Sequence, residues 1–201
     1  MPDFFEVVHH QRACRNFAPE GVPDDLIAQV LDAAVFAPSA ENKQPWAFVV
    51  VRDDATRTRI AELTKQVWES GARAYEETHL DPRILADVDQ ATQTGFASAP
   101  VVVVVCGDAN SAFERTLPSS VFPATQNLLL AATALGLGSA LTTLATAMAK
   151  DLAEILQLPE HVKPMAVVFL GWPAKPLGPP RRTSFKEKSH RDRFGQPFWR
   201  S

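Results

Sequence analysis

The sequence predicts one domain that contains both helices and strands and continues into an extended C-terminal segment. Three patterns indicate this class. Apolar residues recur at helical spacing between Leu26 and Val35, which predicts an amphipathic helix. The run from Val101 to Val105 is apolar at every position, as in a strand that is buried on both faces. Four prolines between residues 173 and 180 disfavour regular structure there.

The length and composition are those of a one-domain globular protein. A chain of 201 residues is long enough for one well-filled core, and no internal repeat or linker divides it. We therefore expect a single domain over residues 1–201, with residues 173–201 as its C-terminal arm. The hydrophobic content of 46% and the charged content of 21% are ordinary for a soluble protein.

Charge and hydropathy exclude several classes of partner. A net charge of -3 disfavours a dedicated nucleic-acid binder, which is usually basic. The basic segment 176–201 is compatible with a solvated arm, an arm that clasps a second subunit, or part of an anion site. The longest apolar run, Ala99 to Cys106, is too short to span a membrane. Because the N-terminus also lacks the lysines of a signal peptide, we expect a cytoplasmic protein without a membrane partner.

The first half of the chain predicts two helices and one strand. Pro23 and the aspartates after it begin a helix, because proline fits the first turn and carboxylates favour the positive end of the helix dipole. Pro38 ends that helix. Residues 46–51 are rich in β-forming side chains and predict a buried strand. Residues 54–78 predict a long charged helix, and Asp81-Pro82 interrupts it.

The second half predicts the rest of the sheet. The strand from Val101 to Val105 is expected at its centre, since both of its faces are apolar. The other expected elements are a helix over residues 122–135 with Pro123 near its start, a short extended segment over 140–144, a helix over 148–157 and a last strand over 165–170.

Several common sites are not supported by the sequence. Gly136 and Gly138 follow a helix and no third glycine comes after them, so a helix C-terminal turn explains them better than a dinucleotide-binding loop. The two cysteines, Cys14 and Cys106, form no disulfide framework, and the five histidines show no metal-ligand spacing. A catalytic thiol would need a histidine as its base, and no histidine is recognisably placed for Cys14. We therefore expect Cys14 to be a small buried residue and not a catalytic thiol.

Two features suit a planar cofactor that carries a phosphate. Arg12 and Arg15 bear guanidinium groups, which match phosphate oxygens bidentately and stay charged. A connector at residues 37–46 follows, with prolines at 38 and 45 and small or amide-bearing residues between them. On these residues alone, a pair of solvated surface arginines is the alternative.

Placed together, these motifs resemble the FMN-dependent nitroreductase family. The resemblance covers nearly the whole chain. Each motif is weak by itself, but their joint order is specific. The motifs are Gln-Arg-Ala-Cys-Arg-Asn-Phe at 11–17, Ala-Pro-Ser-Ala-Glu-Asn-Lys-Gln-Pro-Trp at 37–46, Gln126 to Leu130, Leu135 to Ser139, and Gly171-Trp172-Pro173 before a basic tail.

The resemblance implies an α+β fold in which helices flank a central mixed or antiparallel sheet. It also implies a homodimer of domain-swapped style that binds FMN non-covalently in two clefts at its interface. In the family the first basic motif holds the FMN phosphate, and Arg12, Ala13 and Arg15 inherit that position here. The usual motif is Arg-Arg-Ser-x-Arg, which this chain changes at Gln11 and at Ala13.

The remaining cofactor contacts also come from the resemblance. Arg182 matches best the basic residue by which the C-terminal arm completes the phosphate site, and Arg181 is second. The backbone near the reactive nitrogen of the flavin would be that of Leu141, Thr142 and Thr143, although these threonines are also typical of a plain strand. Residues expected along the ribityl chain and ring edge are Pro38, Ser39, Ala40, Asn42 and, as a weaker candidate that braces the loop, Gln44.

The implied activity is a flavin-dependent oxidoreduction. NADH or NADPH would reduce FMN, and a small-molecule acceptor such as a nitroaromatic or a quinone would then be reduced in the same cleft. Because the flavin carries the chemistry, no catalytic side chain is expected. One alternative is a flavin-fragmenting or dehalogenating member of the superfamily. In that case residues 66–98, which include Trp68 and Tyr75, would form a substrate lid, whereas otherwise they would form a solvated helix. The other alternative is a non-enzymatic protein that binds FMN or a deazaflavin.

Overall fold

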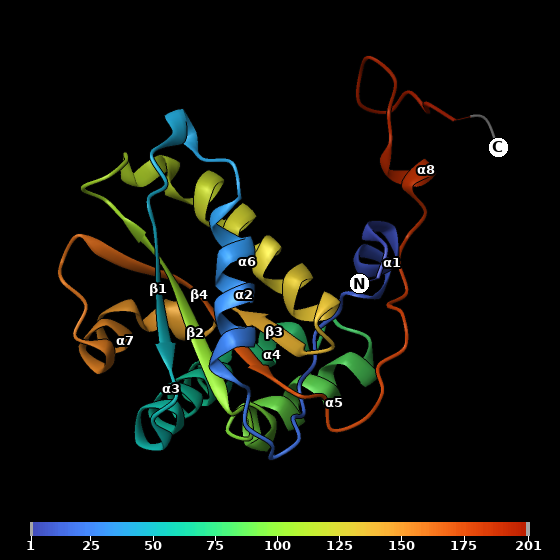
Figure 1. Ribbon diagram of the computed structural model, residues 1–201. Coiled ribbons are helices and arrows are strands. Elements are labelled where there is room, and N and C mark those ends of the chain that lie inside the picture. Colours follow the sequence, from blue (N-terminus) through green and yellow to red (C-terminus); the bar gives the residue numbers. More distant parts are fainter. Residues whose placement is uncertain (1, 200–201) are drawn as a thin grey trace.

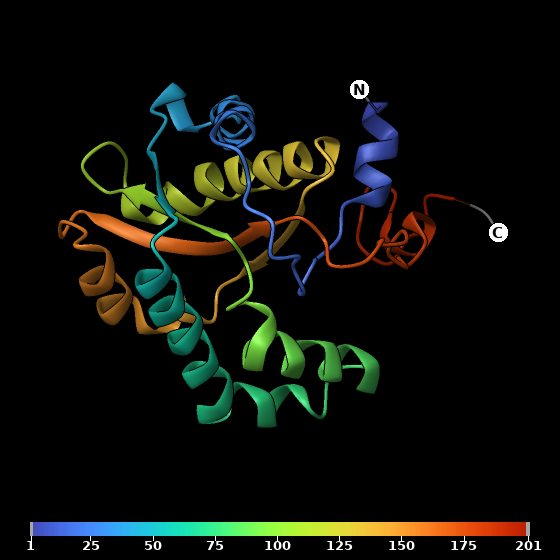
Figure 2. The same ribbon diagram turned by 60° about the horizontal axis from the view of Figure 1, so that its bottom comes forward.

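A four-stranded antiparallel sheet lies between two layers of helices in the computed structural model, which describes residues 2–199 (Figures 1 and 2). The strand order is β1-β2-β4-β3. The strands are β1 (Trp46–Val51), β2 (Val101–Asp108), β3 (Gly138–Thr142) and β4 (Val162–Gly171). This architecture confirms the prediction of an α+β fold with helices on both sides of an antiparallel sheet.

The central strands β2 and β4 supply the core, because their apolar side chains alternate between the two faces. Val102 and Val104 belong to one apolar cluster, and Val103 and Val105 to the other. The prediction of a central strand over residues 101–105 is therefore confirmed. The prediction that residues 46–51 are buried is wrong for most of β1, since only Val51 is buried and β1 lies at an edge of the sheet.

One face of the sheet is covered by α2 (Asp24–Val35) and α6 (Leu117–Ala134), and α1 (Phe4–His10) packs against α6. The helix predicted after Pro23 is confirmed as α2. α6 begins at Leu117 and not at residue 122, because Pro118 occupies its first turn while Pro123 lies inside it. Gly136 follows α6 at a φ of 78°, which confirms the helix C-terminal turn.

The other face is covered by α3 (Asp54–Val67), by residues 91–96 and by α7 (Ala149–Leu156), which matches the helix predicted over 148–157. The single helix predicted over 54–78 is wrong beyond Val67: a π turn at Trp68–Ala72, with Gly71 at a φ of 153°, precedes the short helix α4 (Arg73–Glu76). Asp81-Pro82 begins α5 (Pro82–Gln90), in which the Asp81 carboxylate accepts a hydrogen bond of 2.8 Å from the Arg83 N–H. A second π turn, Ala91–Gly95, follows α5.

The N- and C-terminal segments meet beyond the end of β4. Phe17 forms a β-bridge with Pro173, and the Ala174 N–H donates to the Asn16 carbonyl at 3.1 Å. The chain then extends away from the sheet on the side of α1 and forms α8 (Phe185–Lys188) (Figure 1). Within residues 2–199, none of the helices has the length and apolarity needed to cross a membrane.

Candidate functional site

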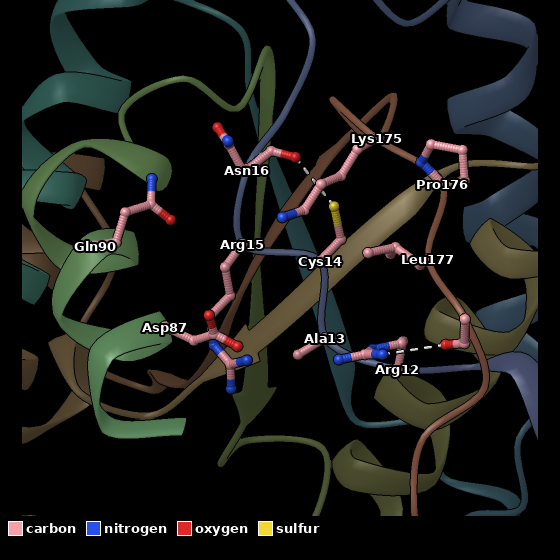
Figure 3. A pocket seen from close by; sticks show the side chains of 11 residues that line it. Arg12, Ala13, Cys14, Arg15, Asn16, Asp87, Gln90, Lys175, Pro176 and Leu177 are labelled. Atoms are coloured by element: carbon pink, nitrogen blue, oxygen red, sulfur yellow. Dashed lines mark hydrogen bonds between the residues drawn. The ribbon is translucent and has the colours of Figure 1, made fainter. Parts of the chain in front are cut away.

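Two adjoining cavities lie where the segment after α1 meets α5 and the C-terminal segment. The first has a volume of about 280 Å³, and Figure 3 displays the side chains around it. The second has a volume of about 560 Å³. Both are lined by Arg12, Ala13, Arg15 and Asp87. The first also contacts Cys14, Asn16, Gln90 and Lys175–Gly178, and the second Asp81, Arg83, Ile84 and Pro179–Arg182.

Cys14 anchors the segment that carries the two arginines. Its N–H donates to the Ser139 carbonyl at 2.8 Å, and its Sγ fills the space beside Gly138, where a Cβ would lie 2.6 Å from that sulfur. Burial is the main cause that raises the pKa of the Cys14 thiol. Cys14 is thus the small buried residue that the sequence predicts, and the arginines on either side of it reach the cavities.

A hydrogen bond joins the first basic motif to the C-terminal segment. The Arg12 Nη1 donates to the Gly178 carbonyl at 3.1 Å (Figure 3). This contact brings Arg181 and Arg182 to the wall of the cavity that Arg12 and Arg15 also line. The four predicted phosphate-binding arginines therefore share one cavity, although the sequence separates the two pairs by more than 160 positions.

The site is strongly cationic. Six basic side chains line the two cavities, against the acidic side chains of Asp81 and Asp87. Burial is the main cause that lowers the pKa of Arg15, while the charge of Asp87 raises it. Guanidinium donors of this kind fit the oxygens of a phosphate group. The basic residues are Arg12, Arg15, Arg83, Lys175, Arg181 and Arg182.

The connector after α2 forms a tight turn elsewhere on the chain. Its Asn42 and Gln44 have positive φ angles of 55° and 49°. The Ser39 hydroxyl accepts from the Gln44 N–H at 3.0 Å, and the Ala40 N–H donates to the Ser120 hydroxyl at 3.2 Å. Gln44 also donates to the Asn42 carbonyl, so it braces the turn as its sequence position suggests. Within the described chain, residues 38–42 and 44 line neither of the two basic cavities.

The predicted flavin-facing residues occupy the end of the edge strand β3. Leu141 is 37% exposed, and Thr143 is exposed just beyond the strand. The Thr142 hydroxyl accepts from the Leu144 N–H at 3.1 Å. Within the described residues 2–199, Leu141, Thr142 and Thr143 also line neither of the two basic cavities. The two basic cavities therefore contain the predicted phosphate-binding residues but not those predicted along the ribityl chain and the ring.

Sequence reasoning missed the contribution of α5 and of Lys175. Asp87 and Gln90 are three positions apart, so they share a helix face, and both line the first cavity. The signal was present in Asp81-Pro82, because an aspartate followed by proline is typical of a helix start as well as of a break. Among residues 2–199, no group of three or more His, Cys, Asp or Glu side chains is arranged to hold a metal ion.

A comparison with protein families decides the chain's relationship. The model of the "Nitroreductase family" matches residues 8–172. The chain belongs to the nitroreductase family. The resemblance read from its motifs is thereby confirmed, and its α+β architecture is a nitroreductase-like fold.

The relatives of this family member carry several kinds of name. The chain is 32% identical to a "Putative NADH dehydrogenase/NAD(P)H nitroreductase" from Methanothermobacter thermautotrophicus over 88% of its own length and 80% of the relative's. A crystal structure of a "putative nitroreductase in complex with fmn" from Desulfovibrio desulfuricans aligns with a TM-score of 0.73 at 24% identity, over 96% of this chain and 99% of the other. Iodotyrosine deiodinase bound to FMN and 3-iodo-L-tyrosine aligns with a TM-score of 0.72 at 22% identity, over 90% and 96%.

The segment considered as a substrate lid is a packed helical hairpin. Trp68 is only 3% exposed, and its Nε1 donates to Asp89 at 2.8 Å. Arg73 donates to the same carboxylate at 2.9 Å, which ties the region of α4 to α5. Trp68 is thus buried and bonded within the hairpin, while Tyr75 remains exposed. This hairpin lies between β1 and β2, and the connection from β2 to α6 contains only residues 109–116.

Proposed function

We propose that this nitroreductase-family member is an FMN-dependent oxidoreductase that uses NADH or NADPH to reduce a small aromatic acceptor, such as a nitroaromatic or a quinone, in a ping-pong reaction. The observation that carries the proposal is the shared cavity of Arg12, Arg15, Arg181 and Arg182. Such a cluster of guanidinium groups suits the phosphate of FMN. The names of the nitroreductase relatives support the reductase activity.

The chain's own residues would bind and orient the cofactor. Arg12 and Arg15 would hold the phosphate, with Arg182, Arg181 and Lys175 closing the site from the C-terminal side. Bound FMN supplies reversible two-electron redox chemistry between a reduced nicotinamide and the acceptor. The backbone of Leu141, Thr142 and Thr143 would position polar groups at the flavin ring. No side chain of the chain is required as a nucleophile or a metal ligand.

We further propose that a second copy of the chain completes the site. The turn at residues 38–44 lines neither basic cavity of its own chain, and in this proposal the partner chain supplies it. An apolar groove of about 370 Å³ between α1, α2 and α6 supports this proposal. Phe4 and Phe36 line it and are 64% and 79% exposed, and large exposed apolar patches are typical of subunit interfaces.

A dehalogenating activity is the alternative within the family, and the similarity to iodotyrosine deiodinases supports it. The candidate lid, residues 66–98, forms a packed hairpin whose parts are joined by the hydrogen bonds of Trp68 and Arg73 to Asp89, and this favours the reductase. A flavin-fragmenting enzyme with such a lid is disfavoured for the same reason. A non-enzymatic flavin-binding protein would share the phosphate site but would show no turnover.

Two measurements test the proposal in sequence. The absorption spectrum of the purified protein should contain the bands of oxidised flavin. Protein loaded with FMN should then oxidise NADH or NADPH when a quinone or a nitroarene is added, with parallel-line kinetics. A halogenated tyrosine as acceptor tests the alternative activity. Absence of turnover with every acceptor, from protein fully loaded with FMN, would refute the reductase and favour the binding protein.

A further inference from the structure

An acidic side chain faces the proposed phosphate site from α5. Asp87 lines both basic cavities together with Arg12 and Arg15. In Figure 3 the Asp87 carboxylate and the Arg15 guanidinium point toward the same part of the cavity. A carboxylate at this place is unexpected in a site for a phosphate dianion, because like charges repel.

Asp87 influences Arg15 without engaging it. The charge of Asp87 favours the charged form of Arg15. Within residues 2–199, however, no hydrogen bond and no ion pair within 4.0 Å joins the two side chains. The N–H donors of Arg15 therefore remain available to another anion.

The neighbouring aspartate of α5 has a different role. Asp89 accepts hydrogen bonds from Trp68 and Arg73, and so it holds the hairpin together. Residues two positions apart point to different sides of a helix. Asp89 therefore makes structural hydrogen bonds within the hairpin, whereas the Asp87 side chain lines the cavity.

The position of α5 opposite Arg15 is set by close backbone packing. A Cβ at Gly95 would lie 2.0 Å from the Arg15 carbonyl oxygen, so only glycine permits the π turn after α5 to approach this segment. The backbone directly after α5 therefore packs against Arg15, and Asp87 on α5 lines the cavity beside it.

We infer that Asp87 is a built-in competing anion for the phosphate site: its carboxylate weakens the binding of a phosphate group at Arg12 and Arg15 and keeps the cofactor exchangeable. This inference rests on the proposed FMN function. Asp87 acts on the phosphate of the ligand and not on its ring. Its effect must therefore depend on ligand charge and on ionic strength.

The test compares Asp87→Asn with the wild type in titrations of the apoprotein with FMN and with riboflavin, which lacks the phosphate. Flavin fluorescence reports binding. We expect FMN to bind on the order of fivefold more tightly to the variant, corresponding to about 1 kcal/mol, and riboflavin affinity to be unchanged. The gain should shrink in high salt. Asp151→Asn is the matched control, because it removes an exposed acidic charge from a separate cavity, and it should leave FMN affinity unchanged.

Three results would overturn the inference. They are unchanged FMN affinity, weaker FMN binding, and an equal change for FMN and riboflavin, which would indicate a direct contact with the ring or a change in the fold. If the wild type binds no flavin, the proposed function fails separately. Inorganic phosphate is then the probe, and stabilisation of the protein by phosphate in thermal unfolding should be greater for Asp87→Asn than for the wild type.

Discussion

Arg12 donates a hydrogen bond of 3.1 Å to the carbonyl of Gly178, and this contact links the two chain segments that carry the basic residues of the site. We expect Arg12→Ala, Arg15→Ala and Arg182→Ala each to weaken FMN binding by about tenfold or more, since each removes a charge-assisted partner of the phosphate. Flavin retained after gel filtration and the dissociation constant measure the effect.

Arg59→Ala serves as the control for these variants. Arg59 lies on α3 and lines a separate surface cavity with Glu62 and Asp151. The Arg59→Ala variant should therefore retain the flavin content of the wild type. If a triple variant of Arg12, Arg15 and Arg182 is still isolated fully yellow, the assignment of the phosphate site is wrong.

Gly95 provides a prediction for stability and site geometry together. Gly95→Ala places a Cβ against the Arg15 carbonyl, so the π turn and the arginine segment must separate. We expect a loss of about 1–3 kcal/mol in the free energy of unfolding, as for other overpacked positions, and weaker flavin binding. Gly21→Ala is the control, because a Cβ there meets nothing within 4 Å. Equal urea midpoints for both variants would contradict the close packing.

The hydrogen bonds to the Asp89 carboxylate should make the stability of the fold depend on pH. Hydrogen bonds from Arg73, and then from Trp68, hold the pKa of the Asp89 carboxyl below its ordinary value. The stability that this carboxylate contributes is therefore present above its unfolded-state pKa of about 3.9 and is lost as pH falls through the lower folded-state pKa. Asp89→Asn should be less stable than the wild type near neutral pH.

Urea unfolding at neutral pH and near pH 2 measures this difference, which should shrink or vanish in acid. Glu62→Gln, on the exposed side of α3, should show little difference at either pH. A deficit of Asp89→Asn that is the same at both pH values would argue against the charged interaction.

Phe36 tests the proposed dimer. It is 79% exposed at the end of α2 and lines the apolar groove, so Phe36→Glu should leave a single folded chain intact. We expect the wild type to sediment as a dimer and the variant to dissociate and lose flavin. Tyr75→Glu, a change at a residue that is 64% exposed on α4, should remain dimeric. A monomeric wild type would remove the basis for a shared site.

Local sequence patterns predicted much of the fold and part of the site. The spacing of apolar residues in 24–35 and the valines of 101–105 depend only on near neighbours, and both elements formed as expected. The Arg12 and Arg15 motif also marked the place where a basic cavity lies. The helix α5 was missed because Asp81-Pro82 has the same local signature at the start of a helix and at a break.

By itself, then, the sequence determined the family, the class of fold, and the residues that carry positive charge. Only the tertiary structure decided that Arg12 meets Gly178, that Asp87 faces Arg15, and that residues 38–44 lie outside the basic cavities of one chain. The physical reason is the range of the interactions. Periodicity and capping act over a few residues, whereas contacts across the cavity exist only once the whole core has packed and set the distance between segments.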